Sequence, residues 1–165
     1  MSRSAAPALA VSHGLLRALV ALNLLAGLFI LTLLVLSLVA APFFVKAMGI
    51  APGTLLLGGR LIMLFGLASI PLMHRLLTRL LAIVGTVGAG DPFVPLNAQR
   101  LRTCAWALLG LELLHLAVGA ASAAGQIDVD WDFTPTGLLA VLLLFVLAQV
   151  FAQGARMRDD LEGTV

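Results

Sequence analysis

Glu112 and His115 are the pair of side chains whose types and spacing are best suited to chemistry. Residues three apart share one face of a helix, and a Glu-x-x-His pair is a ligand pattern of di-iron four-helix bundles. Such a centre needs a second pair and two more carboxylates. Glu112 is the sole acidic residue in the long apolar stretches. We therefore expect no metal site and no cofactor. No segment holds a nucleophile with its base and orienting group, so we expect no enzyme.

Five polar side chains within the apolar stretches form a second candidate set. Charged groups inside a membrane are costly and often functional. The helical rise puts Asn23, Glu112 and Gln149 within about 6 Å of one level, which predicts a buried polar cluster that joins three helices. The cluster either holds helices together or binds a ligand or proton. Arg60 lies nearer the membrane surface opposite to this cluster, within reach of His115, a backbone carbonyl or water. Its role is open between structure and function.

The composition places the chain in a lipid bilayer. Of its 165 residues, 61% are hydrophobic and 11% are charged, whereas soluble domains carry about 25% charged residues. A chain this short and apolar cannot bury its side chains in one aqueous core. The net charge of +2 is small and its basic residues are spread among loops, which argues against direct nucleic-acid binding. The single cysteine, Cys104, excludes an internal disulfide.

Long uncharged runs predict an all-α fold, a single-domain bundle of four transmembrane helices, since a span needs about 20 apolar residues. Pro71 is expected to end or kink the second span. Beyond it lies a cytoplasmic loop, 73–102, whose first part is amphipathic and suits a helix on the membrane surface or a protruding helix end. A charged cytoplasmic tail, 154–165, ends the chain. The predicted spans are residues 18–40, 55–72, 103–124 and 135–153.

Lysine and arginine residues near the spans predict the orientation, because they favour the cytoplasmic side. The first outer loop has Lys46 alone, and the acidic loop 125–134 has no basic residue. Both termini and the central loop are therefore predicted to be cytoplasmic. The basic residues on that side are Arg3, Arg17, Arg75, Arg79, Arg100, Arg102, Arg156 and Arg158.

Two segments on this side carry the most specific pattern. They are Gly90-Asp91-Pro92-Phe93-Val94-Pro95-Leu96-Asn97-Ala98-Gln99-Arg100-Leu101-Arg102 and the ending from Val150 to Val165. Both resemble the hallmark of the bacterial family called domain of unknown function 2975, which often has an acidic residue where Gln149 stands here. The resemblance implies a small inner-membrane protein of unassigned activity, whose gene often neighbours that of a helix-turn-helix regulator. The candidate residues of this cytoplasmic motif are Asp91, Pro92, Phe93, Asn97, Arg100, Arg102, Phe151, Gly154, Arg158 and Asp160.

Two functions remain open. The favoured one is a regulatory or sensory module that couples the lipid bilayer to a cytoplasmic protein partner, for which the resemblance implies a helix-turn-helix regulator. The alternative is a bundle that transports or binds a small molecule or protons through its intramembrane polar residues. Self-association is compatible with both. We also expect the acidic tail to continue the fourth helix and dock against the loop arginines, with Phe93 and Leu161 as apolar anchors.

Cysteine labelling tests the predicted orientation. In a Cys104→Ala background, single cysteines beside Arg79, Arg100 or Arg158 should react with a membrane-impermeant maleimide only after cells are opened, because those positions face the cytoplasm. Cysteines beside Lys46 or Asp130 should react in intact cells. A position beside Asp130 that reacts only in opened cells contradicts the orientation.

Overall fold

The computed structural model describes residues 5–49, 54–91 and 93–162. Within these ranges every regular element is a helix. Four of the helices, all except α2, are long and apolar enough to cross a membrane. The all-α prediction and the prediction of four long apolar helices are therefore confirmed. The helices are α1 (Ala5–Val39), α2 (Ala41–Met48), α3 (Thr54–Gly88), α4 (Pro95–Ala123) and α5 (Thr136–Glu162).

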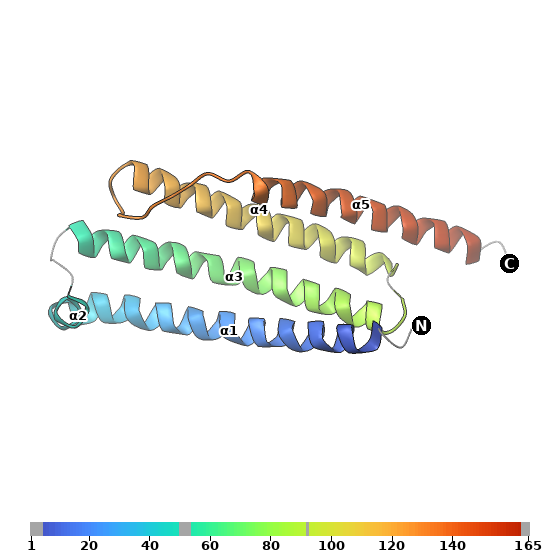
Figure 1. Cartoon of the computed structure of the whole chain (residues 1–165), viewed down its shortest axis with the longest axis horizontal. Helices are drawn as coiled ribbons and strands as arrows, with labels where there is room; N and C mark the ends of the chain where they lie inside the picture. Colours follow the sequence, from blue (N-terminus) through green and yellow to red (C-terminus); the bar gives the residue numbers. More distant parts are fainter. Residues whose placement is uncertain (1–4, 50–53, 92, 163–165) are drawn as a thin grey trace.

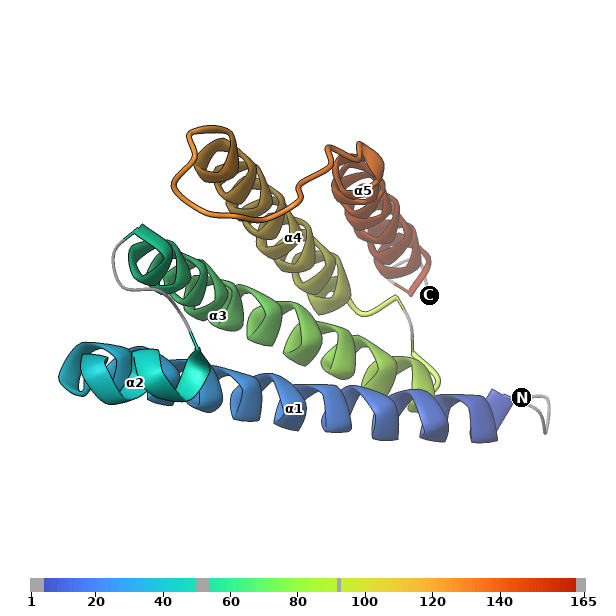
Figure 2. The ribbon, with the colours of Figure 1, turned by 60° about the vertical axis from the view of Figure 1, so that its left-hand side comes forward.

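The four long helices form one open row, where the sequence predicted a bundle (Figures 1 and 2). α3 packs between α1 and α4, and α5 packs on the far side of α4. Neighbouring helices are antiparallel, so the start of α1 and the end of α5 lie at the same end of the row (Figure 1). Lipid tails are as apolar as leucine, so apolar faces are not driven to close around one core. Side chains such as Leu25 and Phe29 accordingly remain exposed.

α3 continues through Pro71 as one helix. The segment after Pro71 is therefore a continuation of α3, which agrees with the predicted protruding helix end and not with a separate surface helix. Transmembrane helices tolerate proline where neighbours support the backbone. Here the side-chain amide of Asn23 on α1 donates to the carbonyl oxygen of Ile70 at 3.2 Å, one residue before the proline. The connection between α3 and α4 consequently shortens to residues 89–94, and the predicted tail is helical as far as Glu162.

Polar residues mark both ends of one apolar zone on α1, α3 and α4. On α1 the zone runs from Arg17 to Ser37, twenty residues or about 30 Å of helix, which is the thickness of a bilayer's hydrocarbon core. We call the end with Arg17 the arginine end. Contacts between the helices align this zone with residues 60–79 on α3, where His74 and Arg75 lie toward the arginine end, and with residues 102–122 on α4.

α5 is displaced along the row relative to the other three helices. Its first turn lies beside Glu112, midway along α4. The carboxyl group of Glu112 occupies the space that a side chain at Gly137 would need. Its last turns reach past the arginine end, where Arg158 contacts Asp91. α5 therefore spans only part of the apolar zone.

The connection between α4 and α5 fills the space that this displacement leaves. It folds back along α4 (Figure 1), and the hydroxyl of Ser122 donates to the carbonyl oxygen of Val129 at 2.7 Å. Ile127 is buried, and the indole ring of Trp131 lies directly on Gly119. The absence of a side chain at Gly119 is what lets the ring approach α4.

Replacing Gly119 tests this packing. A methyl group there would overlap the indole ring of Trp131, and overpacking of this kind costs about 1–3 kcal/mol. Gly119→Ala should therefore lower the apparent midpoint of thermal unfolding in detergent. Gly85→Ala is the matched control, because a Cβ there meets nothing within 4 Å and alanine favours a helix by about 1 kcal/mol. Equal midpoints for the two variants would contradict the packing of the returning chain.

Candidate functional site

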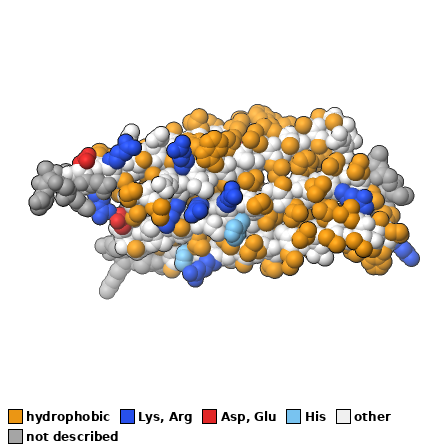
Figure 3. Space-filling view, turned by 180° about the vertical axis from the view of Figure 1, so that it is seen from behind, with side chains coloured by type: hydrophobic (Ala, Val, Ile, Leu, Met, Phe, Trp, Pro, Cys, Tyr) orange, Lys and Arg blue, Asp and Glu red, His pale blue; other side chains and the backbone are white. Residues whose placement is uncertain are grey.

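The short connection after α3 and the last turns of α5 meet at the arginine end. On the face shown in Figure 3, lysine and arginine side chains gather toward this end. We call residues 91, 93–100 and 151–158 the loop–tail cluster. The rings of Phe93 and Phe151 lie 5.5 Å apart between centroids, at 34°. Gly154 admits Phe93 against α5, since a Cβ at Gly154 would lie 3.0 Å from the phenyl ring. The two segments of the sequence motif are thus parts of one surface.

Asn97 is the fully buried centre of the loop side. Its side-chain amide donates to the hydroxyl oxygen of Thr86 at 2.8 Å, and its carbonyl oxygen accepts from Arg100 at 2.9 Å. The same Arg100 nitrogen also donates to the carbonyl oxygen of Ala82 at 3.3 Å. These bonds join the end of α3 to the start of α4 and fix how the chain turns. Arg100 is therefore held by the loop itself and is not left free to receive the tail.

The tail contacts the loop with the opposite charge pattern from the predicted one. Arg158 donates to a carboxylate oxygen of Asp91 at 2.6 Å, so the tail supplies the cation and the loop supplies the anion. The tail continues the helix and Phe93 anchors it, as predicted, but the ion pair has the opposite charge pattern, because the displacement of α5 brings Arg158 to the level of Asp91. The side chains of Asp159 and Glu162 lie outside the described residues. Asp160 lies farther on and is exposed. Pro92 and the side chain of Leu161 lie outside the described residues.

The strength of this contact depends on its apolar part. Both partners of the ion pair are half-exposed, with 48% of the Arg158 side chain and 41% of the Asp91 side chain accessible. Exposed ion pairs contribute about 0–1 kcal/mol. An aromatic pair such as Phe93 and Phe151 contributes about 0.5–1.5 kcal/mol beyond its burial. The phenyl rings and Gly154 therefore hold the tail on the loop, and the ion pair fixes its orientation.

Arg60 caps the end of α1. Its guanidinium donates to the backbone carbonyl oxygen of Ser37, and its Nε atom lies 3.4 Å from the hydroxyl oxygen of the same serine. Ser37 is fully buried. A cation near the C-terminus of a helix is stabilised by the partial negative charge of the last carbonyls. Of the partners considered from the sequence, Arg60 thus takes a backbone carbonyl.

The predicted cluster of Asn23, Glu112 and Gln149 does not form. Asn23 bonds to the backbone of α3, Glu112 lies against the first turn of α5, and Gln149 lies near Arg102 at the arginine end. The depth estimate assumed that the fourth span fills the bilayer and that the helices enclose one core. The open row separates α1 from α5, and the displacement of α5 moves Gln149 away from the level of Glu112.

His115 faces the returning chain and a cavity between α3 and α4. Its ring lies 5.5 Å from that of Trp131, measured between centroids. The cavity has a volume of about 330 Å³ and a mainly apolar lining that includes Ser69 and His115. Glu112 points toward α5 instead, so the two candidate ligands serve different contacts. The part of the chain that the structure describes contains no group of three or more His, Cys, Asp or Glu side chains able to hold a metal ion.

Comparison with known proteins identifies the family. The model of the family "Protein of unknown function (DUF2975)" matches residues 60–165, which is more than half of the chain, and the chain belongs to this family. The resemblance carried by the central loop and the tail is therefore confirmed. No curated protein and no solved structure matches the chain.

Removing the buried amide tests the role of Asn97. Asn97→Ala leaves the Thr86 oxygen and the Arg100 guanidinium without this partner, and an unsatisfied buried group costs about 1–3 kcal/mol. The apparent unfolding midpoint in detergent should fall. Gln99→Ala, two residues along the same turn but exposed, is the control and should leave the midpoint nearly unchanged. If Asn97→Ala unfolds with the wild-type midpoint, the network does not hold the turn.

Proposed function

We propose that this member of the family is a membrane-embedded regulatory or sensory module and that its loop–tail cluster binds a cytoplasmic protein partner. The observation that carries the proposal is the convergence of the two motif segments. Phe93 packs on Phe151, and Asp91 pairs with Arg158, although a whole hairpin of chain separates them. Such contacts give the arginine end a defined surface, as a binding partner requires.

The side of the membrane follows from charge. Both described chain ends and the loop–tail cluster lie at the arginine end (Figure 1), and basic residues next to membrane spans favour the cytoplasm. We therefore assign the loop–tail cluster to the cytoplasmic face of the inner membrane. From Gln149, which lies near Arg102, to Arg158 is nine residues, or about 14 Å of helix. The end of α5 accordingly extends beyond the lipid into water.

The surface of the cluster has the character of a protein interface. Phe93, Leu96 and Met157 are 44%, 48% and 63% exposed, and the charged pair Asp91–Arg158 lies beside them. Apolar side chains rimmed by charges are typical of protein–protein contacts. A helix-turn-helix regulator is the partner that the family resemblance suggests, and it would receive its signal through α5 or the loop.

The transport alternative has less support. Asn23 and Arg60 are engaged in bonds that join α1 to α3, and His115 lines a different cavity from Gln149. Glu112 is placed by its contact with α5. A transport pathway would need these groups along one route, whereas each lies at a separate helix contact.

Site-specific photocrosslinking in cells tests the proposed partner surface. A photoreactive residue at Leu96 should crosslink to a discrete soluble protein, because Leu96 is exposed in the loop–tail cluster. The same residue at Leu57, which is 60% exposed at the other end of α3, is the control and should give no soluble adduct. Asp91→Arg should weaken the Leu96 adduct, and the double variant Asp91→Arg, Arg158→Asp should restore it in part.

The contrary result would favour transport. If Leu96 and Leu57 give the same adducts, the loop–tail cluster has no specific partner. If Glu112→Gln also abolishes a cellular phenotype while Asp91→Arg preserves it, the intramembrane groups carry the function.

A further inference from the structure

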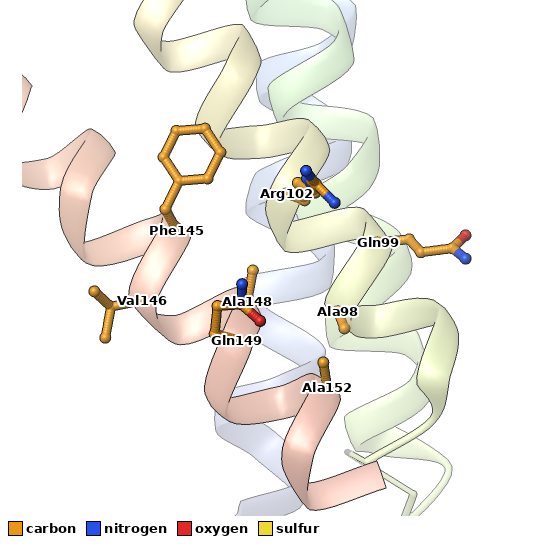
Figure 4. Close-up of a pocket in the computed structure, with 8 residues that line it drawn as sticks. All are labelled: Ala98, Gln99, Arg102, Phe145, Val146, Ala148, Gln149 and Ala152. Carbon is orange, nitrogen blue, oxygen red and sulfur yellow. The ribbon is translucent and has the colours of Figure 1, made fainter. Parts of the chain in front are cut away.

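A groove lies between α4 and α5 at the arginine end (Figure 4). Its volume is about 350 Å³. Small residues on both helices leave this space, among them Ala98 on α4 and Ala152 on α5. Phe145 forms one end, and its ring is held edge-on by Trp106, 5.4 Å away between centroids at 87°. The groove is therefore a built feature of the α4–α5 contact.

The groove combines an apolar wall with one cation. Phe145 and Val146 line its apolar side, and Arg102 on α4 and Gln149 on α5 supply polar groups (Figure 4). No aspartate or glutamate is among the lining residues. Among the described residues, the ion pair that forms joins Arg158 to Asp91. The charge of Arg102 is therefore not neutralised by an acidic side chain in these residues. The electrostatic complement of this groove is an anion with an apolar portion.

The depth of the groove indicates where such a molecule resides. Arg102 lies at one end of the apolar zone of about 30 Å, at the level of Arg17 on α1. Lipid phosphates of one leaflet lie at this level. Val146 and Leu142 continue the apolar side of α5 toward the bilayer interior, and both are exposed. An acyl chain can therefore leave the groove without entering water.

We propose that this groove binds one anionic phospholipid from the leaflet at the arginine end. Its phosphate accepts hydrogen bonds from Arg102 and Gln149, and an acyl chain lies along Phe145 and Val146. This binding does not depend on the proposed protein partner. Ala98, Gln99 and Ala152 line the groove and also belong to the loop–tail cluster, so the lipid also contacts the turn of α5 that meets the loop.

Quenching of Trp106 fluorescence measures the occupancy of the groove. The full-length chain with Trp131→Phe retains Trp106 as its one tryptophan and is placed in vesicles with brominated phosphatidylglycerol or brominated phosphatidylcholine. Competition between the two lipids gives their relative binding constant. We expect a preference for phosphatidylglycerol that falls about five-fold in Arg102→Gln, the factor that one basic residue contributes at an anionic surface.

The matched control is Arg17→Gln, which removes an exposed arginine from the same level at the far edge of the row. It should keep the wild-type preference. Ala152→Leu provides a second test, because it fills the groove without changing charge, and it should lower the preference as Arg102→Gln does. Only variants whose unfolding midpoint is close to that of the parent chain are compared.

Four results would overturn the lipid site. The first is the same loss of preference in Arg102→Gln and Arg17→Gln, which would mean a diffuse surface charge effect. The second is equal quenching by the two lipids in the parent chain. The third is loss of the preference with millimolar inorganic phosphate, which would assign the site to a free anion. The fourth is efficient crosslinking of two copies through a cysteine at Val146 with no lipid preference, which would assign the groove to self-association.

Discussion

Hydrogen bonds between helices hold this structure together. Lipid tails are as apolar as the helix surfaces, so the hydrophobic effect does not drive the helices to associate. Asn23 bonds to the backbone of α3 beside Pro71, and Arg60 bonds to the last turns of α1. At the other end, Asn97 joins α3 to α4. Between these points the contacts are mainly apolar side chains and glycines, and the outer faces of the helices remain exposed. A few polar contacts thus set how the helices of the row align with one another.

The displacement of α5 is the second determinant of the molecule. Because α5 begins beside Glu112, the chain before it folds back along α4 and seats Trp131 on Gly119. Because α5 also ends beyond the arginine end, Phe151 and Arg158 reach the loop. The returning chain, the loop–tail cluster and the lipid groove are therefore three consequences of one register between α4 and α5.

The polar residues of the spans lie at separate contacts along the row. Arg60 bonds to the carbonyl oxygen of Ser37 near the end of α1. Asn23 supports a helix that continues through proline. The residues that fit a binding role, Arg102 and Gln149, lie at the boundary of the apolar zone. The groove that we propose as a ligand site thus lies where the apolar zone meets the arginine end.

The sequence by itself determined that the chain is all helical, that it has four membrane-length apolar helices, and that it belongs to its family. Uninterrupted apolar length and the two motif segments are local properties of the sequence, so they can be recognised without knowing which helices contact one another. Register and partner choice are not local. The continuation of α3 through Pro71, the pairing of Arg158 with Asp91 and the separation of Asn23 from Gln149 were decided by the tertiary structure. Each depends on how far one helix slides along another, and a uniform apolar face in lipid specifies that distance only weakly.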